Sequence, residues 1–124
     1  MGLWERLTGR RRPADDQWQA PIVQEICIAM LRLVPNDWKS AYLVLRVAEE
    51  GLGGGLSHSA ITRKASVDGV LRDTEFVSPD MEVFTATRKL ELGWMERGIT
   101  FKRVIISAID DGNGWEIRSD YDPA

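Results

Sequence analysis

The few side chains in this sequence that could carry out catalysis or bind a metal do not form a recognisable set. The chain has one histidine, His58, and one cysteine, Cys27. A zinc site needs several clustered His or Cys ligands, and a cysteine nucleophile needs a base within hydrogen-bond reach. Nothing in the sequence places His58 beside Cys27. We therefore interpret Cys27 as a buried structural thiol. The sequence therefore predicts no enzyme, no metal and no cofactor.

A glycine-rich segment at 51–55 is the second candidate for chemistry. The backbone N–H groups of such a loop can bind phosphate, but a P-loop ends in Gly-Lys-Ser/Thr and the dinucleotide motif needs a third glycine. Here the chain continues Leu56-Ser57-His58, so both motifs fail. We interpret the segment as a mobile hairpin loop in which glycine supplies positive φ angles.

Carboxylates gather in the segment 110–122. Its first five residues, Asp-Asp-Gly-Asn-Gly, lack the alternating acids and the distal glutamate of a calcium loop, so they predict a hairpin turn. From Trp115 onward, apolar or small residues alternate with charged ones, as in a strand with one buried face. Two carboxylates on one strand face more often form a solvated surface than an acid–base pair. The charged face is predicted to be mostly acidic and consists of Glu116, Arg118, Asp120 and Asp122.

The segment from Asp15 or Asp16 to Pro35 has the spacing of an amphipathic helix. Pro21 falls in its first turn, where the missing N–H is tolerated, and Pro35 ends it. The buried stripe is predicted to contain Ile22, Val23, Ile26, Cys27, Met30, Leu33 and Val34.

A second helix is predicted between Ser78 and Gly98. Ser78 is interpreted as the N-cap, with Pro79 at the first helical position, and Gly98 as the residue that ends the helix. The face toward the core is predicted to contain Val83, Thr87, Leu90 and Trp94, flanked by Phe84 and Met95.

The remaining segments read as strands with short connections. The run 100–109 is apolar on both faces, which predicts a strand inside the sheet. The second and third strands are expected to turn near Lys64 or at Asp68-Gly69. The predicted strands cover 38–49, 57–63, 65–76, 100–109 and 115–122.

The order of these elements predicts an α+β fold in two layers. About five mainly antiparallel strands form the sheet, and the two main helices cover one face, in the order α-β-β-β-α-β-β. Of the five tryptophans, Trp94 and Trp115 are expected in the core, and Trp4 and Trp18 are the candidates for exposure.

Length and composition limit the class of protein. The 124 residues suit a single domain at 15–124, preceded by a basic tail at 1–14. A net charge of -3 argues against general nucleic-acid binding, and no apolar run approaches the roughly 20 residues of a membrane span. One cysteine and the absence of a secretion signal predict a cytoplasmic protein.

Three parts of the sequence resemble the YezG-like immunity (antitoxin) proteins. They are the helix segment Ile22-Val23-Gln24-Glu25-Ile26, the stretch Val34-Pro35-Asn36-Asp37-Trp38 before the first strand, and the ending from Gly112 to Asp122. The resemblance covers roughly residues 20–122. It implies an inhibitor that binds and neutralises a cognate bacterial toxin, a nuclease being the expected class.

A nuclease site is basic because it binds phosphates, so an acidic surface can steer onto it and block it. The residues expected to contact the toxin are Asp110, Asp111, Glu116, Asp120 and Asp122.

Two other classes of function stay open. One is a small-ligand-binding protein or enzyme with a pocket between helices and sheet, with His58 and Glu49 or Glu50 at its mouth. The other is a secretion chaperone or adaptor that grips its partner with an exposed helix face and residues 1–14.

Overall fold

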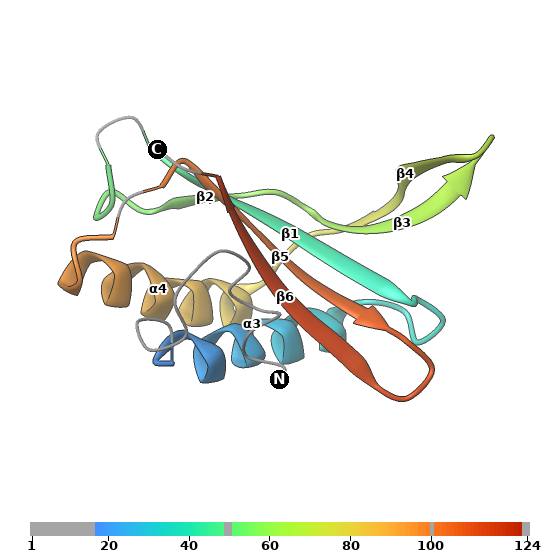
Figure 1. Cartoon of the computed structure of the whole chain (residues 1–124), viewed down its shortest axis with the longest axis horizontal. Coiled ribbons are helices and arrows are strands. Elements are labelled where there is room, and N and C mark those ends of the chain that lie inside the picture. The colour runs from blue at the N-terminus through green and yellow to red at the C-terminus, as the bar shows by residue number, and fades with distance from the viewer. Residues whose placement is uncertain (1–16, 49–50, 100, 123–124) are drawn as a thin grey trace.

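The described part of the chain is arranged in two layers, a six-stranded antiparallel sheet and two helices packed on one of its faces (Figure 1). The computed structural model describes residues 17–48, 51–99 and 101–122, with the side chains of 65–67 excepted. The α+β class and the placement of both helices on one face are confirmed. The order is α-β-β-β-β-α-β-β, so the sheet has one strand more than expected.

Helix α3 (Gln19–Leu33) buries one stripe against the sheet and against the second helix. Pro21 lies in its first turn, as predicted, while the expected start at residues 15–16 and the tail 1–14 lie outside the described residues. The hydroxyl of Tyr121 donates a hydrogen bond to the side-chain oxygen of Gln19, which joins the start of the helix to the sheet. The fully buried apolar residues of this stripe are Val23, Ile26, Cys27, Ala29 and Met30.

Cys27 is a buried structural thiol, as expected. Its sulfur lies 3.9 Å from the carbonyl oxygen of Ser107. Burial raises the pKa of the Cys27 thiol to about 12. A thiol that stays protonated at neutral pH is a poor nucleophile, so Cys27 contributes packing rather than reactivity.

Helix α4 (Met81–Glu96) begins at a different cap from the predicted one. Asp80, not Ser78, is the N-cap, and its carboxylate accepts a hydrogen bond of 3.1 Å from the N–H of Val83. A carboxylate at this position also interacts favourably with the helix dipole, which explains why aspartate takes the cap. Gly98, at φ +63°, ends the helix as predicted.

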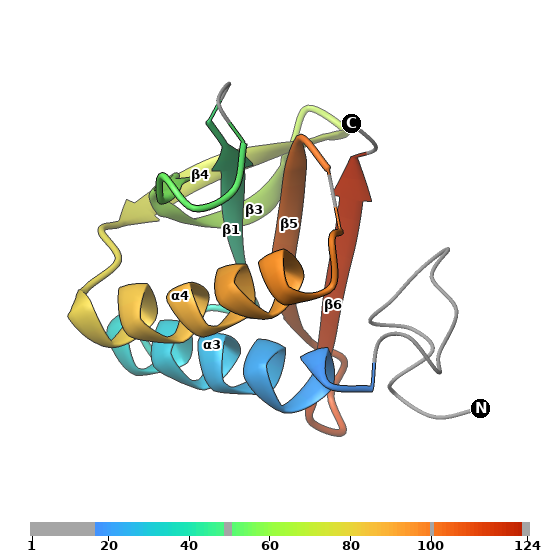
Figure 2. The same ribbon diagram turned by 90° about the vertical axis from the view of Figure 1, so that its left-hand side faces the viewer.

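The sheet has the strand order β4-β3-β1-β5-β6, and β2 pairs with the end of β1 beside β3. Strand β5 lies between β1 and β6, which confirms that the run after residue 100 is an interior strand. Figure 2 shows α3 and α4 side by side beneath the sheet. The strands are β1 (Ser40–Val47), β2 (Leu56–His58), β3 (Ile61–Val67), β4 (Val70–Val77), β5 (Arg103–Asp110) and β6 (Trp115–Asp122).

The middle of the chain differs from the prediction. The two expected strands at 57–63 and 65–76 are three, because the chain leaves the ladder after His58 and re-enters it at Ile61. The turn lies at Asp68-Gly69, where both residues have positive φ (52° and 77°). Lys64 is not a turn but follows a register shift between β3 and β4. Such an irregularity breaks the alternation from which a strand is recognised in sequence.

Three of the expectations for tryptophan can be compared with the structure. Trp94 is fully buried, as predicted. Trp115 is 38% exposed, so its placement in the core was wrong. It faces Asp110 in the outermost pair of the β5–β6 ladder, beside the hairpin loop, where the core no longer covers the strand. Trp18 is half-buried, and Trp4 lies outside the described residues.

Candidate functional site

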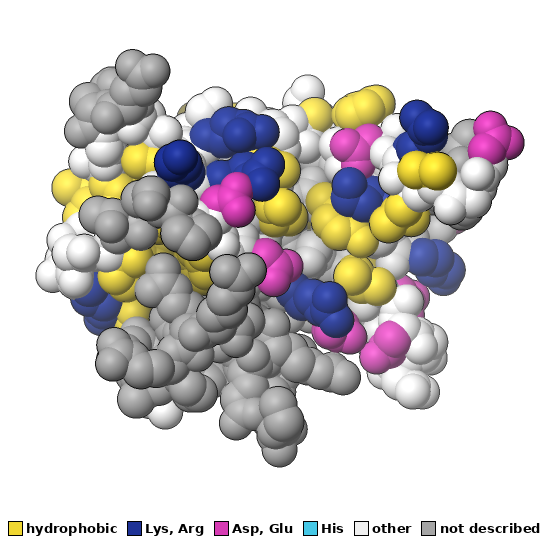
Figure 3. Space-filling view, turned by 45° about the horizontal axis from the view of Figure 1, so that its top comes forward, with side chains coloured by type: hydrophobic (Ala, Val, Ile, Leu, Met, Phe, Trp, Pro, Cys, Tyr) yellow, Lys and Arg dark blue, Asp and Glu magenta, His cyan; other side chains and the backbone are white. Residues whose placement is uncertain are grey.

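The face of the sheet turned away from the helices is the first candidate surface. Alternation along β1 and β5 buries Leu43, Leu45, Val104 and Ile106 and turns their neighbours outward. In Figure 3, apolar side chains and side chains of both charges lie interspersed on this side of the molecule. Three of the predicted contact residues, Glu116, Asp120 and Asp122, lie on this outer face.

Two of the predicted contact residues shape the hairpin loop itself. The carboxylate of Asp110 accepts a hydrogen bond of 2.9 Å from the N–H of Gly112 and lies 3.6 Å from the ammonium group of Lys39. The carboxylate of Asp111 accepts a hydrogen bond of 2.9 Å from the N–H of Asn113. These short-range bonds are those that Asp forms in turns, so the loop is a turn, as predicted.

Two further predicted residues are held in ion pairs on the strand face. Glu116 lies 2.8 Å from the guanidinium of Arg118, and only 13% of its side chain is exposed. This pairing raises the pKa of Arg118, and the charge of Asp120 adds to the effect. Asp122 pairs with Arg103, which faces it across the β5–β6 ladder, at 2.5 Å. Both pairs neutralise a carboxylate that was expected to face a partner.

The prediction of a mostly acidic face therefore needs correction. Lys39, Arg103 and Arg118 neutralise three of the five carboxylates, and two of these cations come from outside β6. Asp111 and Asp120 are exposed and have no ion pair with any residue that the structure describes. Among the described residues, the outer face is consequently a mixed surface, on which Asp120 and Arg46 both remain outside the ion pairs.

Apolar side chains lie between these charges. Val44 and Ile105 pair across β1 and β5 on the outer face, and Tyr42 follows on the same face of β1. Phe76, in register with Thr62 of β3, is 64% exposed. The ammonium group of Lys64 lies 4.9 Å from the centre of the Tyr42 ring. A surface that combines aromatic and aliphatic groups with charges has the composition of a protein interface.

The glycine-rich loop after β1 closes a hairpin, since β1 and β2 pair antiparallel. Its Gly53 donates a hydrogen bond of 3.0 Å from its N–H to the carboxylate of Glu91 on α4. Glu91 is only 1% exposed and also pairs with Arg88. The loop is thus tied to α4 rather than arranged around a phosphate. Sequence reasoning missed Glu91, because its partner lies 38 residues away.

His58 belongs to the same region, and the described residues that it contacts form no catalytic set. Its Nε2 lies 2.7 Å from the hydroxyl of Thr87 and its Nδ1 3.1 Å from the carbonyl oxygen of Leu56. The ring meets Phe84 edge-on, with centroids 4.7 Å apart. Burial lowers the pKa of His58, although the Leu56 carbonyl and the charge of Glu91 act in the opposite direction. This geometry is that of a structural histidine.

Acidification is expected to destabilise the fold through His58. The folded state lowers the pKa of His58, so the unfolded chain takes up a proton at a higher pH than the folded protein. The contribution of neutral His58 to the free energy of unfolding is therefore fully present above about pH 6.5 and falls as the pH drops through the folded pKa. Urea unfolding measured from about pH 7.5 downward tests this. The variant His58→Gln removes the contribution and should show a shallower pH dependence. Equal slopes for both proteins would contradict the expectation.

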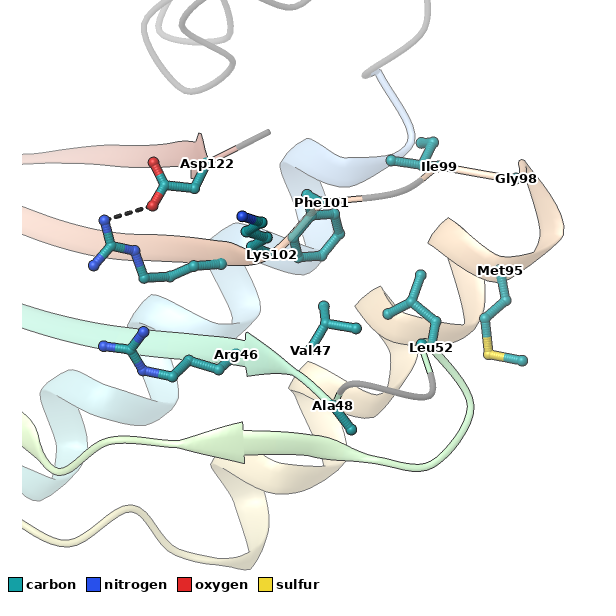
Figure 4. A pocket seen from close by; sticks show the side chains of 12 residues that line it. Arg46, Val47, Ala48, Leu52, Met95, Gly98, Ile99, Phe101, Lys102 and Asp122 are labelled. Atoms are coloured by element: carbon teal, nitrogen blue, oxygen red, sulfur yellow. Dashed lines mark ion pairs between the residues drawn. The ribbon is translucent and has the colours of Figure 1, made fainter. Parts of the chain in front are cut away.

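A separate cavity of about 960 Å³ opens where β1 ends, beside the C-terminal end of α4 (Figure 4). It lies between helix and sheet, as the small-ligand hypothesis requires. His58 is not among its lining residues but lines a smaller hollow with Glu91, and Glu49 and Glu50 lie outside the described residues. Asp122 is the one predicted contact residue at its rim.

No group of three or more His, Cys, Asp or Glu side chains within the described ranges could hold a metal ion. None of the described helices is long and apolar enough to cross a membrane. In comparisons with known proteins, no family model matches the chain, and no curated protein matches it significantly. A proposal of function therefore depends on the surface geometry and on the resemblance in sequence.

Proposed function

We propose that this protein is an immunity protein that binds and neutralises a cognate bacterial toxin through the outer face of its sheet. The observation that carries the proposal is this face, on which Asp120 remains outside the ion pairs beside half-buried Ile105, with exposed Asp111 in the hairpin loop at the end of β5. Aromatic and aliphatic anchors supply much of the energy of protein interfaces, and charges at their border set the partner. The toxin class follows from the resemblance to YezG-like immunity proteins.

A nuclease is the toxin class that suits the two carboxylates. Its active site must be basic to bind phosphates, so negative charges on the inhibitor accelerate association. Asp120 and Asp111 are expected to supply this attraction. Glu116 and Asp122 are expected to act indirectly, since Arg118 and Arg103 already neutralise them and hold them against the sheet.

Charge reversal tests which residues steer the toxin. Asp111→Lys and Asp120→Lys are each expected to lower the association rate about tenfold at low salt and to weaken its dependence on salt. Glu96→Lys is the matched control, because this residue is exposed on α4, in the layer behind the sheet. Surface changes of this kind shift stability by only about 0.5 kcal/mol. Stopped-flow binding that ranks all three variants alike would contradict the proposed surface.

Purification of the partner tests the function itself. Tagged protein is incubated with a lysate of its own cells, bound protein is released with salt, and the released fraction is assayed for nuclease activity. Adding the immunity protein back in equimolar amount should abolish that activity. A released fraction without toxic activity, or one that the protein fails to inhibit, would exclude the proposal.

A version of the protein that lacks residues 1–14 separates this proposal from the secretion-chaperone hypothesis. Inhibition by an immunity protein should survive the deletion. Loss of partner binding would favour the chaperone hypothesis.

A further inference from the structure

The cavity at the end of β1 has charged residues toward one end and apolar residues toward the other. Figure 4 shows Arg46 and Asp122 toward one end and Leu52 and Met95 toward the other, with Val47 between them. At about 960 Å³ it is of the size that accommodates a drug-sized molecule. Its floor lies between the layers, whereas Arg46 and Arg103 at its rim lie on the outer face of the sheet, in line with Val44 and Ile105.

The floor is apolar and continuous with the core. Phe101 is only 4% exposed, and its ring packs edge-on against Trp94 at 4.3 Å between centroids. Val47, Leu52 and Ile99 are half-buried and pack against the same core. Such a floor favours an apolar occupant, because binding then removes apolar area from water.

The rim carries an excess of positive charge. Arg46 stands directly opposite Arg103 in the β1–β5 register, an arrangement of like charges that is unfavourable on a sheet. Asp122 neutralises Arg103. Neither Arg46 nor Lys102 has an ion pair with any residue in the described ranges. Two cationic side chains are therefore available at one end of an apolar cavity, in a protein whose net charge is negative.

The rim is also preorganised. Lys102 lies between hydrogen bonds to both neighbouring strands, since the N–H of Val47 donates to its carbonyl oxygen (3.0 Å) and its own N–H donates to the carbonyl oxygen of Asp122 (3.1 Å). Arg46 lies within the β1–β5 ladder. Sites built on paired strands hold their side chains more accurately than sites built on loops.

We propose that this cavity binds a small amphiphilic anion, with its apolar body over Val47 and Leu52 and its charged head group between Arg46 and Lys102. A carboxylate or phosphate head would form charge-assisted hydrogen bonds with the guanidinium of Arg46. The anion would also relieve the repulsion between Arg46 and Arg103. This inference does not rest on the proposed toxin, because neither Arg46 nor Lys102 is among the residues expected to contact it.

Decanoate is the probe, compared with decanol and with decyltrimethylammonium, which share its apolar chain. Calorimetry on the full chain, below the concentration at which decanoate self-associates, should give saturable binding of one equivalent. Decanol should bind at least about tenfold more weakly, and the cationic probe should not bind. Backbone amide resonances of Leu52, Ile99 and Lys102 should shift with decanoate. Absence of binding, or equal binding of decanoate and decanol, would overturn the proposal.

Variants locate the site. Arg46→Gln and Lys102→Gln should each weaken decanoate binding by about tenfold. Arg72→Gln is the matched control, because this exposed arginine lies on β4 and outside the cavity, and it should bind decanoate like the parent protein. Leu52→Ser should weaken decanoate and decanol equally, since it changes only the floor. Decanoate affinity that is unchanged in Arg46→Gln and Lys102→Gln would also overturn the proposal, and it would leave the toxin experiments unaffected.

Discussion

Replacement of Trp94 by alanine is expected to lower the free energy of unfolding by about 3–5 kcal/mol. Trp94 is fully buried, contacts Phe101 and lies 6.0 Å from the ring of Tyr121. Its removal would leave a cavity at the point where α4 meets the sheet. A loss of this size is a large fraction of the roughly 5–15 kcal/mol that stabilises an ordinary domain.

Urea unfolding followed by circular dichroism measures this change. Met81→Ala is a suitable control, because Met81 lies on the same helix and is 74% exposed. It should change the free energy of unfolding by about 0.5 kcal/mol or less. A Trp94→Ala protein as stable as the control would mean that α4 does not pack on the sheet as described.

Gly93→Ala is expected to destabilise the protein by about 1–3 kcal/mol, although alanine normally favours a helix interior over glycine by about 1 kcal/mol. A Cβ atom at Gly93 would lie 2.1 Å from Cζ3 of Trp18. The indole also contacts Arg97, whose guanidinium lies 4.1 Å from the centre of its ring and donates a hydrogen bond to the carbonyl oxygen of Gly93. Movement of the tryptophan away from a new Cβ atom would disturb this packing.

A double-mutant cycle isolates this contact from the intrinsic preference of the helix. In a Trp18→Ala background the clash disappears, so Gly93→Ala should become neutral or stabilising. The change of sign is the decisive observation. If Gly93→Ala destabilised both backgrounds equally, Trp18 would not be the reason for glycine at this position.

The sequence predicted the elements that have strong periodicity. The stripe of α3 and the face of α4 follow from apolar residues at helical spacing, and the hairpin of β5 and β6 follows from alternation around a loop of Asp, Asn and Gly. These signals are local, so one sequence suffices to read them. The boundary between β2 and β3 was missed because the chain leaves and re-enters the ladder of β1 within a few residues.

The electrostatic character of the surface could not be read in the same way. Alternation correctly placed Glu116, Asp120 and Asp122 on one face, but the cations that neutralise them depend on strand register. Arg103 reaches Asp122 only because β5 and β6 pair in one particular alignment. Counting charges along a segment therefore overestimated its acidity. The cavity could not be predicted either, because its lining comes from β1, α4 and β5, which are far apart in the sequence.

The central position of β5 also affects how the protein is made. About 60 residues separate Val44 from its partner Ile105, and α3 packs against β5 and β6 as well as against α4. Translation adds roughly 5–20 residues per second, so α3 and β1 are synthesised several seconds before β5, the strand that completes their core. Nascent chains on a crowded polysome thus display two apolar surfaces at once. This period is when the polypeptide is most prone to aggregate, and slower initiation or cooler growth should raise the yield of folded protein.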